Sequence, residues 1–188
     1  MNGFERRTEK KKHHILNVAQ RLLIQKGIKD VNILDIAHEA DVSHVTIYHY
    51  WGHKQGLVDA VMEKTLHEVT QQAIEILDQA KTFEEGLDSV LNFEATRFDH
   101  FEPTFKEEII AFERSQIGRD NTLISDSLRR FMMLAPESPT PVRPFSDETV
   151  KVFVYLFRYL KSHGFLDNPK VKQEITDFFK AGIMDYSQ

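Results

Sequence analysis

The stretch of sequence that decides the fold is NILDIAHEADVSHVTIYHYWGHK, residues 32–54. Asn32 is a residue type that caps helix N-termini, and the apolar residues after it recur at the spacing of one face of a short helix. Asp41 then interrupts the pattern with a side chain that tolerates the left-handed backbone of a tight turn. Ser43 is a second N-capping residue, and it precedes the short segment 44–51. We therefore predict two short helices joined by a tight turn.

The second predicted helix, HVTIYHYW over residues 44–51, has a polar side rich in hydrogen-bonding groups and contains no Lys, Arg, Asp or Glu. Two short helices that pack through a few small apolar residues, with a polar face on the second, are the arrangement by which a recognition helix is presented to a major groove. Hydroxyl and imidazole groups suit contacts with phosphates and base edges. The stretch therefore predicts a DNA-binding surface.

The same stretch resembles the signature of the TetR family of bacterial transcriptional regulators. That family has an Ile-Ala pair, a Gly-Val-Ser turn, and a Thr-Leu-Tyr-x-x-Phe run closed by Lys. The matching residues here are Ile36, Ala37, Asp41, Val42, Ser43, Thr46, Ile47, Tyr48, Trp51 and Lys54. Two positions depart from the pattern: Asp41 replaces the Gly, which strains the turn, and Trp51 replaces the Phe. The resemblance is close over residues 10–60, and beyond them it extends only to length and helical character.

The candidate DNA contacts follow from the side-chain chemistry and from this resemblance. Hydroxyls and charge are expected to hold phosphates at Ser43, Thr46, Tyr48, Tyr50 and Lys54. Base-edge contacts are expected from His44, Val45 and His49, since histidine can donate or accept at purine edges and valine can pack on a thymine methyl. Lys54 begins a long predicted helix, where the macrodipole disfavours a cation, so its placement favours a phosphate contact over a structural role. The family also carries Lys at this position.

Length and composition limit the remaining possibilities. A chain of 188 residues with 41% hydrophobic residues can bury the core of one compact unit, or of a small domain with a larger one. The sequence has no cysteine, which excludes disulfides and thiolate chemistry. No apolar run is long enough to span a bilayer, and the N-terminus lacks the apolar stretch of a signal peptide. We therefore expect a cytoplasmic protein with no membrane partner.

The net charge of −5 is unevenly distributed along the chain. Residues 1–54 carry nine Lys and Arg against six Asp and Glu, with six of the nine histidines, whereas residues 55–188 carry fifteen against twenty-three. A basic N-terminal part on an acidic body agrees with a module that faces phosphates. Residues 1–8 are expected to be disordered, and the basic stub of Arg6, Arg7 and 10–12 is either a solvated end or an arm on the DNA backbone.

The rest of the sequence predicts helices and no strands. Apolar residues at helical spacing run from Leu57 to Leu77, and further helix starts are marked by Thr82, by Pro103 and by Asn168-Pro169. The segment PESPTPVRPFS, residues 136–146, holds four of the six prolines and predicts a loop. We therefore predict an all-α protein, with a three-helix helix-turn-helix domain over residues 1–53 and a larger helical domain for ligand binding and dimerisation over residues 54–188.

The larger predicted domain is rich in phenylalanine, since thirteen of the fourteen lie after residue 80. A single phenylalanine at helical spacing is more often core than pocket, but together they exceed what a small bundle needs. An effector pocket in this region is what the TetR resemblance implies, and it would suit an apolar or aromatic molecule held by a few polar groups. The candidate pocket residues are Phe93, Arg97, Phe98, Phe101, Phe105, Glu108, Phe112 and Phe131.

The last two predicted helices each carry an apolar stripe. Packing within one subunit and pairing with a second copy are both open from the pattern, although a two-fold DNA site needs a two-fold protein. The resemblance implies dimerisation through the final two helices. The candidate interface residues are Phe153, Phe157, Leu160, Ile175, Phe178, Phe179 and Ile183.

Other chemistry finds little support in the sequence. His49 and His53 lie four residues apart, but no carboxylate stands at ligand spacing, so no metal is expected. There is no Gly-rich phosphate loop, nucleophile elbow or cysteine nucleophile, and neither a cofactor nor an enzyme activity is expected. The prediction is a homodimeric DNA-binding regulator, a repressor on a palindromic operator that a small effector releases. The alternatives are an all-helical small-molecule carrier or enzyme that ignores DNA, and a DNA-binding protein without effector.

Overall fold

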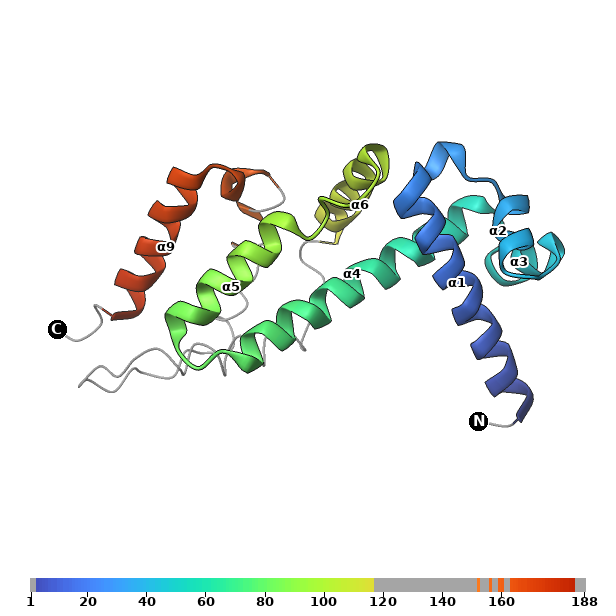
Figure 1. Ribbon diagram of the computed structural model, residues 1–188, viewed down its shortest axis with the longest axis horizontal. Coiled ribbons are helices and arrows are strands. Elements are labelled where there is room, and N and C mark those ends of the chain that lie inside the picture. Colours follow the sequence, from blue (N-terminus) through green and yellow to red (C-terminus); the bar gives the residue numbers. More distant parts are fainter. Residues whose placement is uncertain (1–2, 117–151, 153–155, 157–158, 161–162, 185–188) are drawn as a thin grey trace. The chain divides into compact units, whose positions relative to one another are not determined.

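The computed structural model describes residues 3–116, 152, 156, 159–160 and 163–184 (Figure 1). Among them lie seven α-helices and a short 3₁₀ turn, η1, and no residue of this described part is in a strand, which confirms the predicted all-α class. The helices are α1 (Gly3–Asp30), α2 (Ile33–Glu39), α3 (His44–Trp51), α4 (Lys54–Gln79), α5 (Phe83–Thr96), α6 (Pro103–Ser115) and α9 (Pro169–Met184), with η1 at Phe165–Asp167. In the part described, no helix is both long and apolar enough to cross a membrane.

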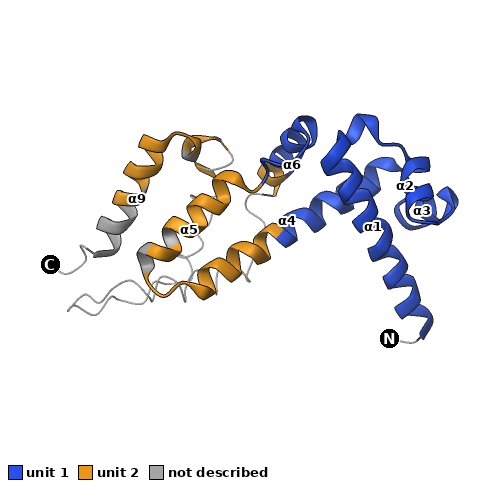
Figure 2. Ribbon diagram, in the orientation of Figure 1, with its two compact units in different colours: residues 1–68, 98–112 blue, residues 69–97, 113–188 orange. Residues whose placement is uncertain are grey.

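The chain forms two compact units (Figure 2). The N-terminal unit comprises residues 1–68 and 98–112, and the C-terminal unit comprises residues 69–97 and 113–188. The N-terminal unit thus extends beyond the predicted domain of residues 1–53. The physical reason is burial: Val58 and Val61 of α4 are almost fully buried, as are Phe105 and Ile109 of α6, so these segments complete a core that the first three helices cannot close alone.

Helix α1 differs from the prediction at its N-terminal end. Residues 3–8 are helical rather than disordered, and three of these six residues, Glu5, Arg6 and Arg7, are good helix formers. The Lys12 ammonium also pairs with the Glu9 carboxylate at 3.1 Å, one turn away. Near the other end, Gly27 has φ 80° and ψ 168°, a non-helical conformation that breaks α1 before it continues to Asp30.

The break at Gly27 is closed by the segment that precedes α6. The Glu102 backbone N–H donates to the Ile24 carbonyl at 2.8 Å, so one of the last carbonyls of the regular helix gains a partner. The Glu102 carboxylate in turn accepts from the Phe105 N–H at 3.0 Å and from the Thr104 hydroxyl, which caps α6. These hydrogen bonds hold the pKa of the Glu102 carboxyl below its ordinary value.

The C-terminal unit has its own core, built on four buried residues of α4 and α5: Ala73, Leu77, Val90 and Leu91. Leu160 and Ile175, two of the predicted interface residues, pack against this cluster. Among the described residues that precede Leu160, Val152, Leu156 and Tyr159 are exposed, and they follow the i, i+4, i+7 spacing of one helix face. Of the other predicted interface residues, Phe153 and Phe157 lie outside the described residues, as do the side chains of Phe178, Phe179 and Ile183.

Candidate nucleic-acid interface

Two capped helices and a strained turn position the candidate interface. The Asn32 side chain accepts from the Asp35 N–H at 2.9 Å while the Asp35 carboxylate accepts from the Asn32 N–H at 3.0 Å, a capping box that starts α2. Asp41 then has φ 51°, which confirms the predicted left-handed turn at a residue with a side chain. The Ser43 hydroxyl accepts from the Thr46 N–H at 3.2 Å and so caps α3, as its position in the sequence predicted.

Helix α3 presents most of its length to solvent. Only Ile47 is buried, at 1% exposure, and it fixes which side of α3 faces the core. On the outer side Val45 is 62% exposed and Tyr48 is 43% exposed. His44 and His49 are also exposed, whereas Thr46 and Tyr50 are half-buried. The fold therefore brings seven of the eight predicted DNA contacts together on this one short helix and its N-cap.

Aromatic contacts order the side chains of α3. The rings of His44 and Tyr48 meet edge to face with centroids 6.2 Å apart, one turn of helix from each other. The Tyr50 ring lies 5.5 Å from that of Trp51, in another edge-to-face contact. Such contacts restrict side-chain rotamers, so these groups are partly arranged before any partner binds.

Lys54, the eighth predicted contact, is engaged within the chain. Its ammonium donates to the Ile28 carbonyl at 2.6 Å, in a half-buried position where α1 ends and α4 begins. An ammonium has three donors, and this bond uses one of them. Lys54 therefore joins α4 to the end of α1, a structural role that the sequence did not reveal because the two residues are 26 positions apart.

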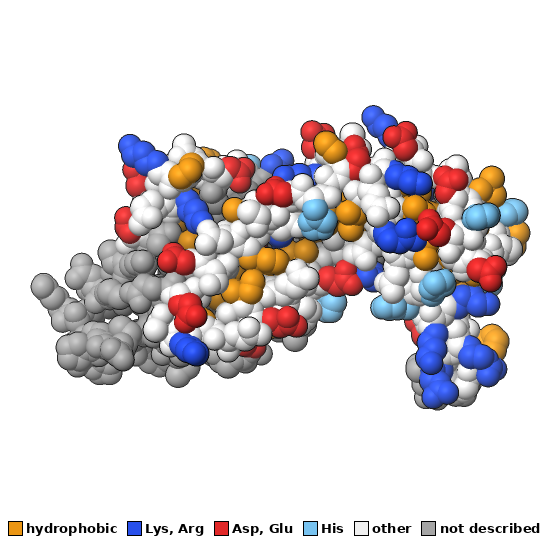
Figure 3. Space-filling model, viewed as in Figure 1, with side chains coloured by type: hydrophobic (Ala, Val, Ile, Leu, Met, Phe, Trp, Pro, Cys, Tyr) orange, Lys and Arg blue, Asp and Glu red, His pale blue; other side chains and the backbone are white. Residues whose placement is uncertain are grey.

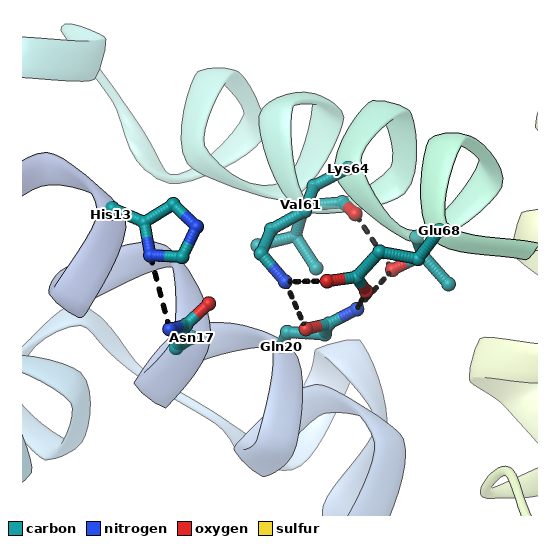
Figure 4. Close-up of polar contacts among 7 residues, drawn as sticks. His13, Asn17, Gln20, Val61, Lys64 and Glu68 are labelled. Carbon is teal, nitrogen blue, oxygen red and sulfur yellow. Dashed lines mark hydrogen bonds and ion pairs between the residues drawn. The ribbon is translucent and has the colours of Figure 1, made fainter. Parts of the chain in front are cut away.

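A polar cluster joins α1 to α4 within the N-terminal unit (Figure 4). The Gln20 amide donates to the Thr65 hydroxyl at 3.0 Å and to the Glu68 carboxylate at 2.6 Å, and the Lys64 ammonium donates to the Gln20 carbonyl at 2.6 Å and to Glu68. Partial burial alone would raise the pKa of the Glu68 carboxyl, but the hydrogen bonds from Gln20 and Lys64 leave that pKa below its ordinary value. The cluster fixes the angle between α1 and α4.

One contact to α3 comes from a residue that the prediction did not assign to this surface. The Lys12 ammonium lies 5.5 Å from the centroid of the Tyr50 ring, which is the geometry of a cation–π contact. The contact connects the N-terminal half of α1 directly to α3. No local pattern could have indicated it, because the two residues are 38 positions apart in the sequence.

The predicted effector-pocket residues fall into both units. Phe98, Phe101 and Phe105 are buried in the N-terminal unit, where the rings of Phe101 and Phe105 stack with centroids 5.6 Å apart. Glu108 is exposed and Phe112 is half-buried, in the same unit. Phe93 packs against the core of the C-terminal unit, and Phe131 lies outside the described residues.

Arg97, which was expected to orient a ligand, has carboxylate neighbours inside the C-terminal unit. Its guanidinium lies 2.6 Å from a Glu113 oxygen and 3.3 Å from a Glu94 oxygen. The Arg97 side chain is 5% exposed, and those of Glu94 and Glu113 are 10% and 13% exposed. Burial lowers the pKa of the Arg97 guanidinium, and the charge of Glu113 opposes that shift. The guanidinium thus ties the end of α5 to the end of α6.

The residues of α2 and α3 lie within a region that matches a known protein family. Residues 15–61 match the family model of the bacterial regulatory proteins of the tetR family. This range includes all of α2, α3 and the turn between them, the start of α4 and the part of α1 that supports them.

Relatives of known sequence match the same end of the chain. The HTH-type transcriptional regulator BetI of Brucella melitensis is 34% identical over 90 residues, which are 47% of this chain and 46% of that protein. An uncharacterized HTH-type transcriptional regulator of Bacillus subtilis, YvkB, is 40% identical over 50 residues, or 27% of this chain and 26% of that protein. The matches to the BetI proteins thus span about half of their length.

Solved structures match over nearly the whole chain. A TetR-family transcriptional regulator from Pectobacterium atrosepticum gives a TM-score of 0.66 at 17% identity and covers 98% of both chains. A structure described as the molecular basis for control of antibiotic production by bacterial hormones gives a TM-score of 0.54 at 20% identity, covering 91% of this chain and 97% of the other. At these identities the similarity shows the fold alone.

Proposed function

The chain belongs to the TetR family through its N-terminal unit, and we propose that it is a transcriptional regulator that binds a palindromic operator as a homodimer. The observation that supports this most directly is the exposure of α3. The helix is capped by Ser43, aromatic contacts order its side chains, and only Ile47 is buried in the core. A short helix held by one buried residue has most of its side chains available to a major groove.

We assign different roles to two groups of residues on this surface. His44, Val45 and His49 are exposed and would meet base edges. The hydroxyls of Ser43, Thr46, Tyr48 and Tyr50 would bind phosphates, and Lys54 would do so with the ammonium donors that Ile28 leaves available. Phosphate contacts position the protein, whereas base contacts specify the sequence.

The homodimer is needed because two recognition helices must enter successive major grooves, roughly 34 Å apart. The exposed stripe of Val152, Leu156 and Tyr159 supports a partner on this part of the chain. We therefore propose that these three residues lie at the interface, in place of Leu160 and Ile175, which pack within the chain.

We further propose that a small apolar or aromatic effector binds the C-terminal helices and releases the protein from DNA, so that it acts as a cytoplasmic repressor. An effector can only do this by binding one spacing of the two recognition helices better than the other. The BetI proteins are named as transcriptional regulators, which supports the regulatory role proposed for this chain.

The test is binding of purified protein to an operator selected from genomic DNA fragments. Lys54→Ala is expected to weaken binding to all sequences and to lower the salt dependence, whereas His49→Ala is expected to change the sequence preference. Lys26→Ala, an exposed lysine of α1, serves as the control for loss of one charge. Because Lys54 also binds Ile28, the unfolding free energy of each variant is measured in parallel. A parent that selects no sequence, or variants that bind like the parent, would contradict the assignment.

A further inference from the structure

The first part of α1 extends beyond the core of the N-terminal unit (Figure 1). The first buried residue of α1 is Ile15, so the twelve residues 3–14 contribute no fully buried side chain. At 1.5 Å per residue these residues form a helical extension about 18 Å long. Tertiary packing supplies most helix stability in proteins, and this extension has little of it beyond the contact of Lys12 with Tyr50.

Cations concentrate on one side of this extension. Four exposed basic residues, Arg6, Arg7, Lys10 and Lys11, lie within an arc of about 140°, at about 100° per residue. Glu5 lies on the opposite side of the helix, beside Glu9. None of the four cations makes a hydrogen bond or ion pair with another residue in the part of the chain that the structure describes. Figure 3 shows Lys and Arg side chains gathered over this end of α1.

The four cations of the extension repel one another unless an anion lies beside them. Arg6 and Lys10 are four residues apart, as are Arg7 and Lys11, and like charges at this spacing destabilise a helix. An ordered row of anions along the helix would relieve this repulsion. The phosphate backbone of a DNA duplex is such a row, with one negative charge per about 1.7 Å of axis.

A direct contact fixes this extension next to the recognition helix. Lys12, on the side opposite the four cations, contacts the Tyr50 ring of α3 and pairs with Glu9. The extension and α3 belong to the same compact unit. A duplex that α3 contacts would therefore pass near the extension, and the four cations, which lie on the side away from Tyr50, would reach only its flanking backbone.

We propose that residues 3–14 of α1 are an arm that binds the phosphate backbone of the same duplex, outside the base pairs that α3 contacts. This inference rests on the proposed function and adds a second, sequence-independent surface to it. The arm lengthens the protected DNA and raises affinity without changing the preferred sequence. Lys12 acts as a positioning residue, because it sets the angle of the arm through Tyr50.

The test compares two double variants of the full chain on an operator duplex with extended flanks. Arg6→Gln with Lys10→Gln removes two charges from the arm, and Lys26→Gln with Lys29→Gln removes two exposed charges from the far end of α1. For the arm variant, the slope of log affinity against log salt is expected to fall by about 3.6, since each phosphate contact contributes about 0.9 and a dimer loses four cations. The ratio of operator to random-sequence affinity is expected to stay within about two-fold of the parent value, and the control slope is expected to match the parent.

Each outcome decides between the arm, the net charge and the proposed function. An unchanged slope for the arm variant, with the parent still selecting its operator, overturns the arm and leaves the proposed function intact. If the slope falls equally for both double variants, the arm is overturned too, since the net charge of the protein would then explain the effect. A parent that binds no duplex overturns the proposed function itself. A third variant, Lys12→Met, should lower the slope without removing any of the four cations, and circular dichroism checks that α1 remains helical.

Discussion

Replacing Gly27 by alanine tests the way in which α1 ends. Gly27 has φ 80° and ψ 168°, a backbone region that is essentially restricted to glycine. A Cβ there would also meet the Glu102 carboxylate and would lie 2.8 Å from the Thr104 hydroxyl. Backbone strain of this kind costs about 1–3 kcal/mol, and displacement of the side chain that caps α6 adds to it. We therefore expect Gly27→Ala to lower the free energy of unfolding by about 2 kcal/mol or more.

The assay is urea unfolding followed by circular dichroism at the helix band, with a thermal scan in parallel. For a chain of this size a loss of about 2 kcal/mol corresponds to a fall in Tm of about 4–8 °C. Gly52→Ala is the matched control, since Gly52 has φ 75° but no neighbouring atom within 4 Å of a Cβ, so its cost is backbone strain alone.

A double-mutant cycle with Glu102→Ala separates the two contributions at Gly27. If the contact with Glu102 adds to the strain, Gly27→Ala must cost less in the Glu102→Ala background than in the parent. Equal costs in both backgrounds would show that the contact is irrelevant. A Gly27→Ala variant within about 0.5 kcal/mol of the parent, the range of an ordinary surface substitution, would refute the whole account of this helix end.

Two further predictions concern charges inside the units. Arg97→Met is expected to lower the free energy of unfolding by about 3 kcal/mol, because it leaves Glu94 and Glu113 without their buried cation. Urea unfolding measures this loss. A loss no larger than that of the control Arg114→Met, at the exposed end of α6, would contradict the prediction. The depressed pKa of Glu68 means that its carboxylate stabilises the fold above the ordinary value of 4.5, and that this stability is lost as the pH falls through the lower pKa of the folded state. The parent should therefore lose more unfolding free energy than Glu68→Gln between about pH 5 and pH 3, and parallel pH profiles of the two proteins would be evidence against a role for the Lys64–Glu68 pair.

The elements that the sequence determined correctly depend on residues within a turn of one another. The caps at Asn32 and Ser43 are hydrogen bonds between residues three positions apart, and the left-handed turn needs only the tolerance of Asp41. The starts of α6 at Pro103 and α9 after Asn168 are equally local. Because such interactions are complete within a short segment, the sequence of that segment is enough to predict them.

Other features were decided only when distant segments met. The apolar stripe near the C-terminus was predicted at Phe153, Phe157 and Leu160, yet the structure packs Leu160 inward and exposes Val152, Leu156 and Tyr159. Leu160 stands at helical spacing from Leu156 as well, so periodicity alone cannot say which of the two described residues faces the core. That choice is made by the shape of the cluster that the segment packs against.

The surroundings of the candidate DNA surface show the same division. The identity and order of the residues on α3 follow from eight consecutive positions of the sequence. Three contacts around this surface join residues that are 26 to 75 positions apart in the sequence. They are the hydrogen bond from Lys54 to Ile28, the packing of Glu102 against Gly27, and the contact of Lys12 with Tyr50. Such contacts depend on the path of the backbone between them, and a path through several packed helices is fixed by the burial of the whole core rather than by any local pattern.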